Sequence, residues 1–203
     1  MPSSVSVVIS APSGAGKTTL IRELMRKDLR IAFSVSTTTR PRREGEVEGK
    51  SYYYIDDETF RGMIDDNQFL EWAKVHSHYY GTSRKEIDRI WGDGKIPLFD
   101  VDVQGAKNLR SALPDAVFIF VMPPSVRTLA DRLTNRKTEN AEELSIRLSN
   151  AAREMREFPW YDYVVINDQV ERAVSDIESI IHAASLSRDR MRHIAEKIME
   201  EKI

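Results

Sequence analysis

VVISAPSGAGKTT, residues 7–19, places an apolar run directly before a glycine-rich loop, and this order decides the fold. Gly14 and Gly16 have no Cβ, so the backbone can curl until successive N–H groups point at one anion. The helix expected from Thr18 adds the positive end of its dipole. Lys17 can reach the β- and γ-phosphates of a triphosphate, and the Thr18 hydroxyl can be a ligand of Mg²⁺. The stretch therefore predicts a phosphate-binding loop formed by Ala11, Pro12, Ser13, Gly14, Ala15, Gly16, Lys17, Thr18 and Thr19.

The loop departs from the pattern GxxxxGK[ST] at one place, because Ala11 stands where the first glycine is usual. Alanine fits there when its φ is negative, and the N–H groups of the cradle come mainly from residues 13–18. We therefore expect little effect on triphosphate binding. The alternative is a plain glycine-rich turn, but the strand before the loop and the apolar helix positions after it favour a phosphate site; these positions are Leu20, Ile21 and Leu24.

The composition narrows the class of protein. The chain has 203 residues, 41% of them hydrophobic, which is enough to bury a core. Its net charge of −2 gives no global basic field for a nucleic acid polymer or an anionic membrane. The absence of cysteine excludes disulfides, thiolate zinc sites and thiol nucleophiles. With no signal-peptide pattern and no run of roughly 18 apolar residues, we expect a cytoplasmic protein, either a monomer or a homo-oligomer.

Short β-branched or aromatic runs alternate with helical patterns along the chain. We expect fully buried parallel strands at Val5–Ile9, Ile96–Val101, Val117–Val121 and Tyr163–Ile166, and a further strand at Ala32–Ser36. Between them, the apolar spacing predicts helices at Thr18–Lys27, Gln104–Leu113, Ser125–Asn135 and Glu142–Glu157. This alternation favours a three-layer α/β fold with a parallel sheet flanked by helices, in which ligands bind at the carboxyl ends of the strands.

Two segments break this alternation. Residues 37–90 hold a charged loop, the cluster Tyr52-Tyr53-Tyr54 and short strand-like runs, which indicates an inserted subdomain. Residues 136–141 separate two helices, and Asn140 with Glu143 forms a capping-box signal, so we expect a lid there. Apolar residues at helical spacing from Val170 to Ile198 predict a C-terminal helix that packs on the core, in preference to an oligomer contact.

Three arginines follow the strand expected at Ala32–Ser36, in the run TTTRPRREGE. Arg40, Arg42 and Arg43 can hold a second phosphate, since a guanidinium makes paired, charge-assisted bonds to phosphate oxygens. The alternative is a solvated charge run, because several glutamates follow at once. The run TTTRPRREGE by itself leaves both interpretations open.

Seven ordered segments decide between them. The runs APSGAGKTT, FSVSTTTR with EGEVEGKSYYYI, FLEWAKV, YYGTS, DVDVQG, RLTNRKTE and VVINDQ extend from Val5 to about Gln169. In this order they resemble guanylate kinase. The resemblance implies transfer of the γ-phosphoryl group of ATP to GMP, and to dGMP, with Mg²⁺ as the cofactor. It also implies a core at 1–36, a GMP-binding insertion at 37–90, core again at 91–125, a lid at 126–148, and core with a C-terminal helix at 149–203.

The resemblance implies a role for each residue that matches a family motif. The residues implied for GMP are Ser36, Arg40, Arg43, Tyr52, Glu71, Tyr80, Thr82 and Asp102. Those implied for ATP, besides the phosphate-binding loop, are Arg132, Asn167 and Asp168. The catalytic charges implied are Lys17, Arg43, Arg136 and Arg147, and Thr18 would be the Mg²⁺ ligand. Guanine offers donors at N1 and its 2-amino group and an acceptor at O6, so a carboxylate at Glu71 and a hydroxyl at Ser36 or Thr82 complement it.

Some positions depart from the family or stay open. The usual spacing TRxPRxGE is TRPRREGE here, so Arg42 is a possible substitute for Arg43. Asp100 and Asp102 lie two apart at the end of a strand, and Asp100 can orient either a Mg²⁺-bound water or Lys17. Lys137 stands where many relatives have glycine, which would stiffen the lid without removing a donor.

Three other functions compete with a GMP kinase. Asp102 to Gly105 spells DxxG, a GTPase signature, but no NKxD motif accompanies it. A guanylate-kinase-like interaction module that binds a phosphorylated peptide would not be expected to keep Lys17 together with the lid arginines. A kinase of the same fold for another nucleotide or a sugar phosphate would not need Glu71, Ser36 and Thr82 together.

Overall fold

Strand β1 (Val7–Ser10) lies at the centre of the main sheet, because its four apolar or small residues are buried on both faces. The computed structural model describes residues 5–134 and 141–201, without the side chains at 141–144. The sheet has the order β2-β7-β1-β8-β9 and all its pairings are parallel. Its other strands are β2 (Ile31–Phe33), β7 (Ile96–Asp100), β8 (Val117–Met122) and β9 (Tyr163–Ile166).

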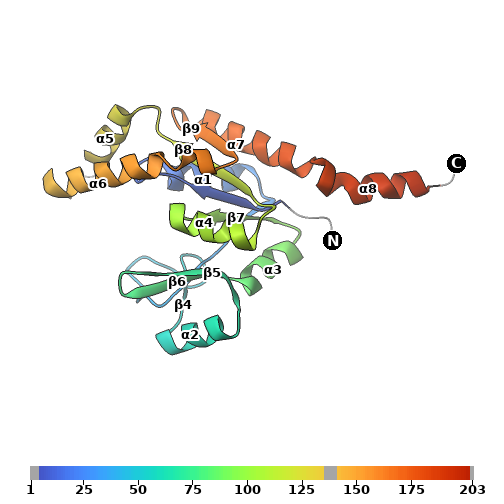
Figure 1. Cartoon of the computed structure of the whole chain (residues 1–203), viewed down its shortest axis with the longest axis horizontal. Coiled ribbons are helices and arrows are strands. Elements are labelled where there is room, and N and C mark those ends of the chain that lie inside the picture. Colours follow the sequence, from blue (N-terminus) through green and yellow to red (C-terminus); the bar gives the residue numbers. More distant parts are fainter. Residues whose placement is uncertain (1–4, 135–140, 202–203) are drawn as a thin grey trace.

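Helices cover both faces of this sheet and make three layers (Figure 1). Val7 and Ile9 point into one apolar cluster with α1 (Lys17–Lys27) and α7 (Val170–Ser185). Val8 points to the other face, where the cluster includes residues of α3 (Arg84–Gly92) and α4 (Val103–Ala112). The α/β fold with a parallel sheet flanked by helices is therefore confirmed.

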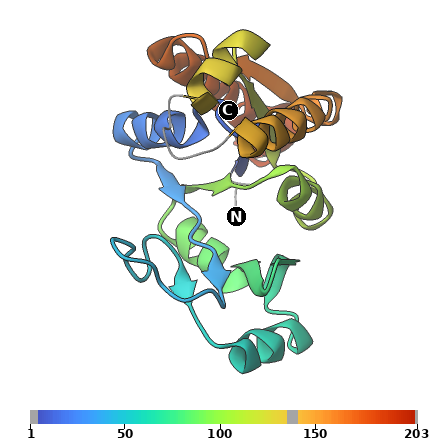
Figure 2. The same ribbon diagram turned by 90° about the vertical axis from the view of Figure 1, so that its left-hand side faces the viewer.

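A second, smaller sheet forms between β2 and α3, and Figure 2 shows it standing apart from the main sheet. Its order is β4-β3-β6-β5, with β3 (Thr37–Thr38), β4 (Tyr53–Tyr54), β5 (Phe69–Val75) and β6 (His78–Ser83). Helix α2 (Asp57–Asp65) closes one side through the buried Phe60, which stacks on Phe69 with ring centroids 4.4 Å apart. Asp56 caps this helix by accepting from the N–H of Thr59 at 2.7 Å.

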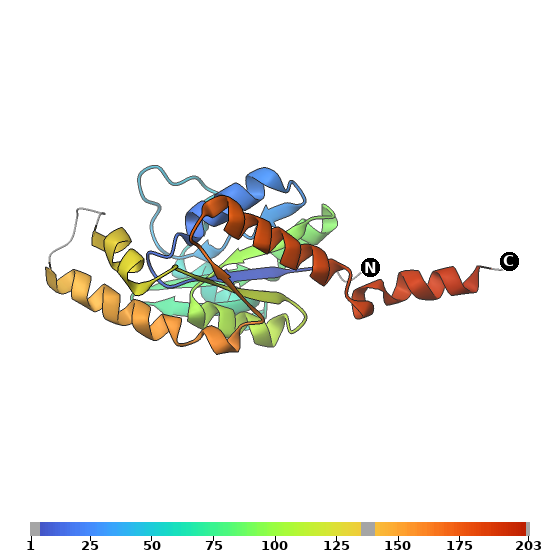
Figure 3. The same ribbon diagram turned by 90° about the horizontal axis from the view of Figure 1, so that it is seen from above.

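The remaining helices lie at the two ends of the main sheet: α5 (Val126–Thr134) and α6 (Ala141–Met155) at the carboxyl ends of its strands, and α8 (Arg188–Glu200) beyond the amino ends (Figure 1). Helices α5 and α6 pack through a small apolar cluster, and the short 3₁₀ helix η1 (Phe158–Trp160) leads to β9. Helix α8 extends away from the body, as Figure 3 shows. Among the described residues, no helix is long and apolar enough to cross a membrane.

Three local expectations differ from the structure. Tyr163–Ile166 is a strand but not a fully buried one, because β9 is the edge of the sheet and Tyr163, Val164 and Ile166 are each more than 40% exposed. The C-terminal pattern is two helices, and only α7 packs on the core; α8 has no buried residue. The strand expected at Ala32–Ser36 is displaced to Ile31–Phe33, since the chain turns after it toward the smaller sheet. Asn140, half of the expected capping box, lies outside the described residues.

Candidate active site

The glycine-rich loop curls at the carboxyl end of β1 and leads into α1, which begins at Lys17. Gly14 and Gly16 have φ values of +89° and +90°, a region that side chains rarely adopt. A Cβ on Gly16 would lie 2.5 Å from Nδ2 of Asn167, so the loop has no room for a side chain there. These two glycines therefore allow the tight turn that brings backbone N–H groups to the positive end of the α1 dipole.

Lys17 is held by the end of the neighbouring strand β7. Its Nζ lies 2.7 Å from Oδ1 of Asp100 and donates to the carbonyl oxygen of Val101, also at 2.7 Å. The sequence left two roles open for Asp100, and this contact favours the one in which it orients Lys17. Asp102 is exposed and caps α4, since its Oδ1 accepts from the N–H of Gly105 at 2.7 Å.

Two side chains expected to contact ATP, Asn167 at the adenine and Arg132 at the phosphates, bind the backbone of the loop instead. Asn167 is 2% exposed, and its Nδ2 donates to the carbonyl oxygen of Ala15 at 2.7 Å. Arg132 of α5 donates to the same oxygen at 3.3 Å and to the carbonyl oxygen of Asn167 at 3.2 Å. Both side chains thus support the backbone of the phosphate-binding loop. Asp168 follows Asn167 and lines a cavity with residues of β9 and α7.

Helix α6 brings two charged side chains of opposite sign to Ser13. Arg147 donates to Oγ of Ser13 at 3.3 Å, so one of the expected catalytic arginines lies beside the phosphate-binding loop. Glu154 accepts from the N–H of Ser13 at 3.2 Å, a contact that sequence analysis missed. A signal existed, since Glu154 is seven residues after Arg147 and two helical turns place both on one face. Arg136, the third expected catalytic arginine, lies outside the described residues.

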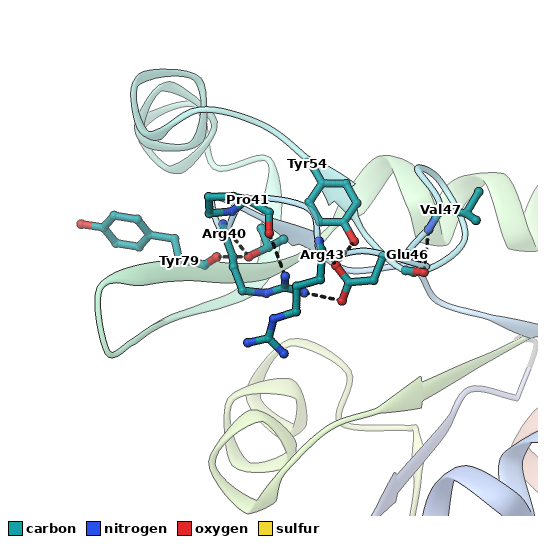
Figure 4. Close-up of polar contacts among 9 residues, drawn as sticks. Arg40, Pro41, Arg43, Glu46, Val47, Tyr54 and Tyr79 are labelled. Carbon is teal, nitrogen blue, oxygen red and sulfur yellow. Dashed lines mark hydrogen bonds and ion pairs between the residues drawn. The ribbon is translucent and has the colours of Figure 1, made fainter.

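The smaller sheet carries a second basic cluster, drawn in Figure 4. Arg40 is 9% exposed, and one of its terminal nitrogens lies 2.7 Å from Oε1 of Glu46. The phenol of Tyr54 donates to Oε2 of Glu46 at 2.7 Å, and the N–H of Arg43 donates to the same oxygen at 2.8 Å. The bond to Arg40 contributes most to lowering the pKa of Glu46, to about 2. Glu46 therefore fixes Arg40 and the backbone of Arg43 side by side.

Two tyrosines expected at the GMP phosphate complete this cluster. The guanidinium carbon of Arg40 lies 5.4 Å from the ring centroid of Tyr52, within cation–π range. The ring of Tyr52 meets that of Tyr80 edge to face at 5.9 Å between centroids. The structure thus brings both tyrosines together with Arg40. Arg43 joins the cluster through its backbone N–H, which is bonded to Glu46. Arg42 is exposed two residues along the loop from Arg40.

Two of the expected guanine contacts, Glu71 and Thr82, meet where β5 and β6 pair. Oγ1 of Thr82 donates to Oε1 of Glu71 at 2.8 Å, and Thr82 is 1% exposed. Burial raises the pKa of Glu71, and the charge of Asp102 raises it further, while the Thr82 hydrogen bond opposes both. Ser36 lies in the segment before β3, where its carbonyl oxygen accepts from the N–H of Tyr53 at 2.9 Å. A partly buried carboxylate with one hydroxyl partner is suited to bind a base that offers several donors.

Comparison with known proteins identifies the family. The family model described as guanylate kinase matches residues 3–184, most of the chain. The chain belongs to the guanylate kinase family. It is 43% identical over 197 residues to the guanylate kinase of Caldanaerobacter subterraneus subsp. tengcongensis, covering 97% of this chain and 96% of that protein. It is 44% identical over 193 residues to that of Syntrophotalea carbinolica, covering 95% and 92%.

A solved structure shows the same relationship. The crystal structure of guanylate kinase from Anaplasma phagocytophilum superimposes with a TM-score of 0.75 at 30% identity, covering 100% of this chain and 98% of that one. The resemblance inferred from seven motifs is thus confirmed over the whole fold. This member of the guanylate kinase family is an enzyme of the kinase class, with a nucleotide-binding core.

Proposed function

We propose that the protein transfers the γ-phosphoryl group of ATP to GMP, or to dGMP, and releases ADP with GDP or dGDP. The contact that carries the choice of guanine is the hydrogen bond of 2.8 Å between Thr82 and Glu71. It leaves one carboxylate oxygen of Glu71 to accept from N1–H and the 2-amino group of guanine. Ser36 would donate to O6, because the hydroxyl proton of Thr82 is already donated to Glu71. Adenine has the opposite pattern, and a site built on hydrogen bonds can reject a wrong partner by about 10⁴ to 10⁵.

The donor half is the phosphate-binding loop with its neighbours. Backbone N–H groups of residues 13–18 and the Lys17 ammonium would hold the β- and γ-phosphates of ATP. Arg147, within 3.3 Å of Ser13, and Arg136 would add charge to the transferring group. We propose that Arg132 and Asn167 act mainly by supporting Ala15, and that Asp168 lies nearer the adenine.

The acceptor half is the basic cluster of the smaller sheet. Arg40 and Arg43 would hold the GMP phosphate, with the phenols of Tyr52 and Tyr80 as further donors. Arg40 is already fixed by Glu46, which lowers the entropy lost when phosphate binds. Asp102, which caps α4, would complete the guanine end, as the family motif implies.

Mg²⁺ fits the residues at the loop. Thr18 offers a hydroxyl at the start of α1 as a ligand, and Asp100, which also contacts Lys17, would reach the ion through a bound water. The described residues contain no group of three or more His, Cys, Asp or Glu suited to a metal. Mg²⁺ usually keeps several waters and is bound by phosphate oxygens with one or two protein ligands. When bound, the ion neutralises charge on the triphosphate.

The reaction asks little covalent chemistry of the protein. The attacking group is a phosphate oxygen of GMP, which is already ionised, so no general base is required. Catalysis then consists of aligning two nucleotides and neutralising the charge on the equatorial oxygens by Lys17 and the arginines. An arginine aimed at a transferring phosphoryl group contributes about 10³ to 10⁵ in rate in other enzymes.

We propose that residues 37–90 and 126–148 move as a GMP-binding insertion and a lid on the core. Closure of both over two bound nucleotides would exclude water, which otherwise hydrolyses ATP. Because its substrates are nucleotides of central metabolism, we place the enzyme in purine nucleotide metabolism in the cytoplasm.

A coupled assay tests the acceptor. ATP-dependent formation of ADP is measured side by side with GMP, dGMP, AMP and UMP under the same conditions. The proposal predicts the highest kcat/KM with GMP, and activity greatest with AMP or UMP contradicts it. Glu71→Gln is the sharpest variant, because it changes only the atoms that face guanine and should raise KM for GMP by about tenfold or more.

A further inference from the structure

Glu86 of α3 is a carboxylate buried at 3% exposure where the chain passes between the two sheets. Its Oε1 accepts from the N–H of Val35 at 3.1 Å, and its Oε2 accepts from the phenol of Tyr53, also at 3.1 Å. Arg89, one turn along the helix, donates to both oxygens, at 2.9 and 3.0 Å. The charge is therefore paired and each oxygen has two donors, which is how a buried carboxylate is stabilised.

Glu86 lies on one crossing between the sheets and accepts a hydrogen bond from the other. Val35 belongs to the outgoing crossing, one residue after Ser34, whose N–H donates to the carbonyl oxygen of Leu98 in β7 at 2.9 Å. Helix α3 is the returning crossing, and it begins directly after Ser83, the last residue of β6. One side chain thus joins the outgoing segment to the returning helix at the place where they leave the core.

The same contacts reach two proposed GMP residues. Ser36 follows Val35 directly, and its carbonyl oxygen accepts from the N–H of Tyr53 at 2.9 Å. Tyr52 precedes Tyr53, so its ring is positioned by a residue whose phenol is bonded to Glu86. Glu86 itself does not reach the phosphate cluster of Arg40, so its influence on GMP must pass through these neighbours.

We propose that Glu86 is a positioning residue for the acceptor nucleotide, which sets Ser36 and Tyr52 relative to the core by holding Val35 and Tyr53. This inference rests on the proposed GMP contacts of Ser36 and Tyr52. The phosphate-binding loop is anchored to β7, α5 and α6 by separate contacts. Glu86 therefore affects the binding of GMP and leaves the binding of ATP unchanged.

The test is a steady-state comparison of Glu86→Ala, Glu86→Gln and Tyr53→Phe with the wild type. For Glu86→Ala we expect KM for GMP to rise about 5- to 20-fold with KM for ATP within twofold, because hydrogen bonds to a buried charge are lost. Tyr53→Phe removes one bond and Glu86→Gln keeps one acceptor oxygen, so both should give intermediate values. Asp88→Ala is the matched control, since Asp88 is an exposed acid on the same helix and should match the wild type.

Two outcomes overturn the role of Glu86. One is a KM for GMP in Glu86→Ala within twofold of the wild type, and the other is an equal rise for both substrates, as general loosening would give. Thermal melting of each variant sets an assay temperature at which all remain folded. Ser36→Ala and Tyr52→Phe are measured in parallel. If these two variants raise KM for GMP and Glu86→Ala does not, the positioning role of Glu86 is rejected and the proposed GMP contacts stand. Unchanged values in Ser36→Ala and Tyr52→Phe reject the proposed GMP contacts and with them the route through which Glu86 acts.

Discussion

The ammonium of Lys17 and the carboxylate of Asp100 are 2.7 Å apart, and the ammonium also contacts the backbone of Val101. Both partners lie at the end of β7, so the end of this strand sets the position of the charged side chain of the phosphate-binding loop. Lys17→Ala should lower kcat by at least about 10². Asp100→Asn keeps the shape and removes the charge, so we expect a smaller loss, about tenfold.

These values come from initial rates at saturating ATP and GMP. Lys27→Ala is the control, since Lys27 is an exposed lysine on the same helix. Near wild-type turnover in Lys17→Ala would contradict the assignment of the loop.

Arg42 and Arg43 can be separated by their alanine variants. The N–H of Arg43 is bonded to Glu46, which also pairs with Arg40, so the backbone of residue 43 is fixed beside Arg40. Arg43→Ala should lower kcat by at least about 10², whereas Arg42→Ala should stay close to the wild type. The measurement is kcat and KM for GMP at saturating ATP. The reverse ranking would assign the role to Arg42.

Binding of GMP should weaken in mild acid because of Glu71. Burial and the charge of Asp102 raise the pKa of Glu71, so its proton returns at a higher pH than for an exposed glutamate. The protonated acid no longer offers a carboxylate to the guanine donors, and the dissociation constant for GMP should rise as the pH falls through this raised pKa. The raised pKa also means that ionisation of Glu71 lowers the stability of the folded state as the pH increases through the same range.

Calorimetric titration of GMP at several pH values tests this. Glu71→Gln serves as the reference, because it retains the ionisation of the GMP phosphate and lacks that of the side chain. The two proteins should differ most at neutral pH and converge in acid; parallel pH profiles would contradict the role of Glu71.

Gly16→Ala should disturb both stability and ATP binding. A residue other than glycine at a φ of +90° costs about 1–2 kcal/mol, and the new Cβ would meet Nδ2 of Asn167. The side chain of Asn167 would have to leave the carbonyl oxygen of Ala15, which loosens the loop. Urea unfolding and the dissociation constant for ATP report the two effects.

Gly92→Ala is the matched substitution, because nothing lies within 4 Å of its Cβ position and its φ is ordinary. It should leave stability unchanged or raise it by up to about 1 kcal/mol. Equal behaviour of the two variants would show that the loop does not need its left-handed glycine.

The strands at the centre of the sheet were predictable because burial on both faces leaves a continuous apolar run. Val117–Met122 is such a strand, and its unbroken apolar pattern is typical of a central parallel strand. Tyr163–Ile166 has the same β-branched character, yet it lies at the edge of the sheet. The residues of one strand do not predict its place in the strand order. Helix α8 illustrates the same limit, since its apolar spacing predicts a helix without showing what that helix contacts.

The candidate site divides in a similar way. Lys17, Arg40 and Glu71 could be found because motifs fix their spacing in the sequence. The contacts of Asn167 with Ala15 and of Glu154 with Ser13 join residues more than 140 positions apart, and only the fold brings them together. Sequence motifs therefore predict which charges meet the nucleotides, and tertiary structure reveals which side chains hold the loop that carries them.

The path of the chain through Val35 and Glu86 has an evolutionary consequence. Everything between these residues leaves and re-enters the core at neighbouring points, since Val35 and Glu86 are in direct contact. A segment attached in this way can be exchanged as a cassette without breaking any pairing of the parallel sheet. New acceptor specificities can therefore arise by replacing one continuous stretch of sequence, while the machinery that handles the triphosphate is inherited unchanged.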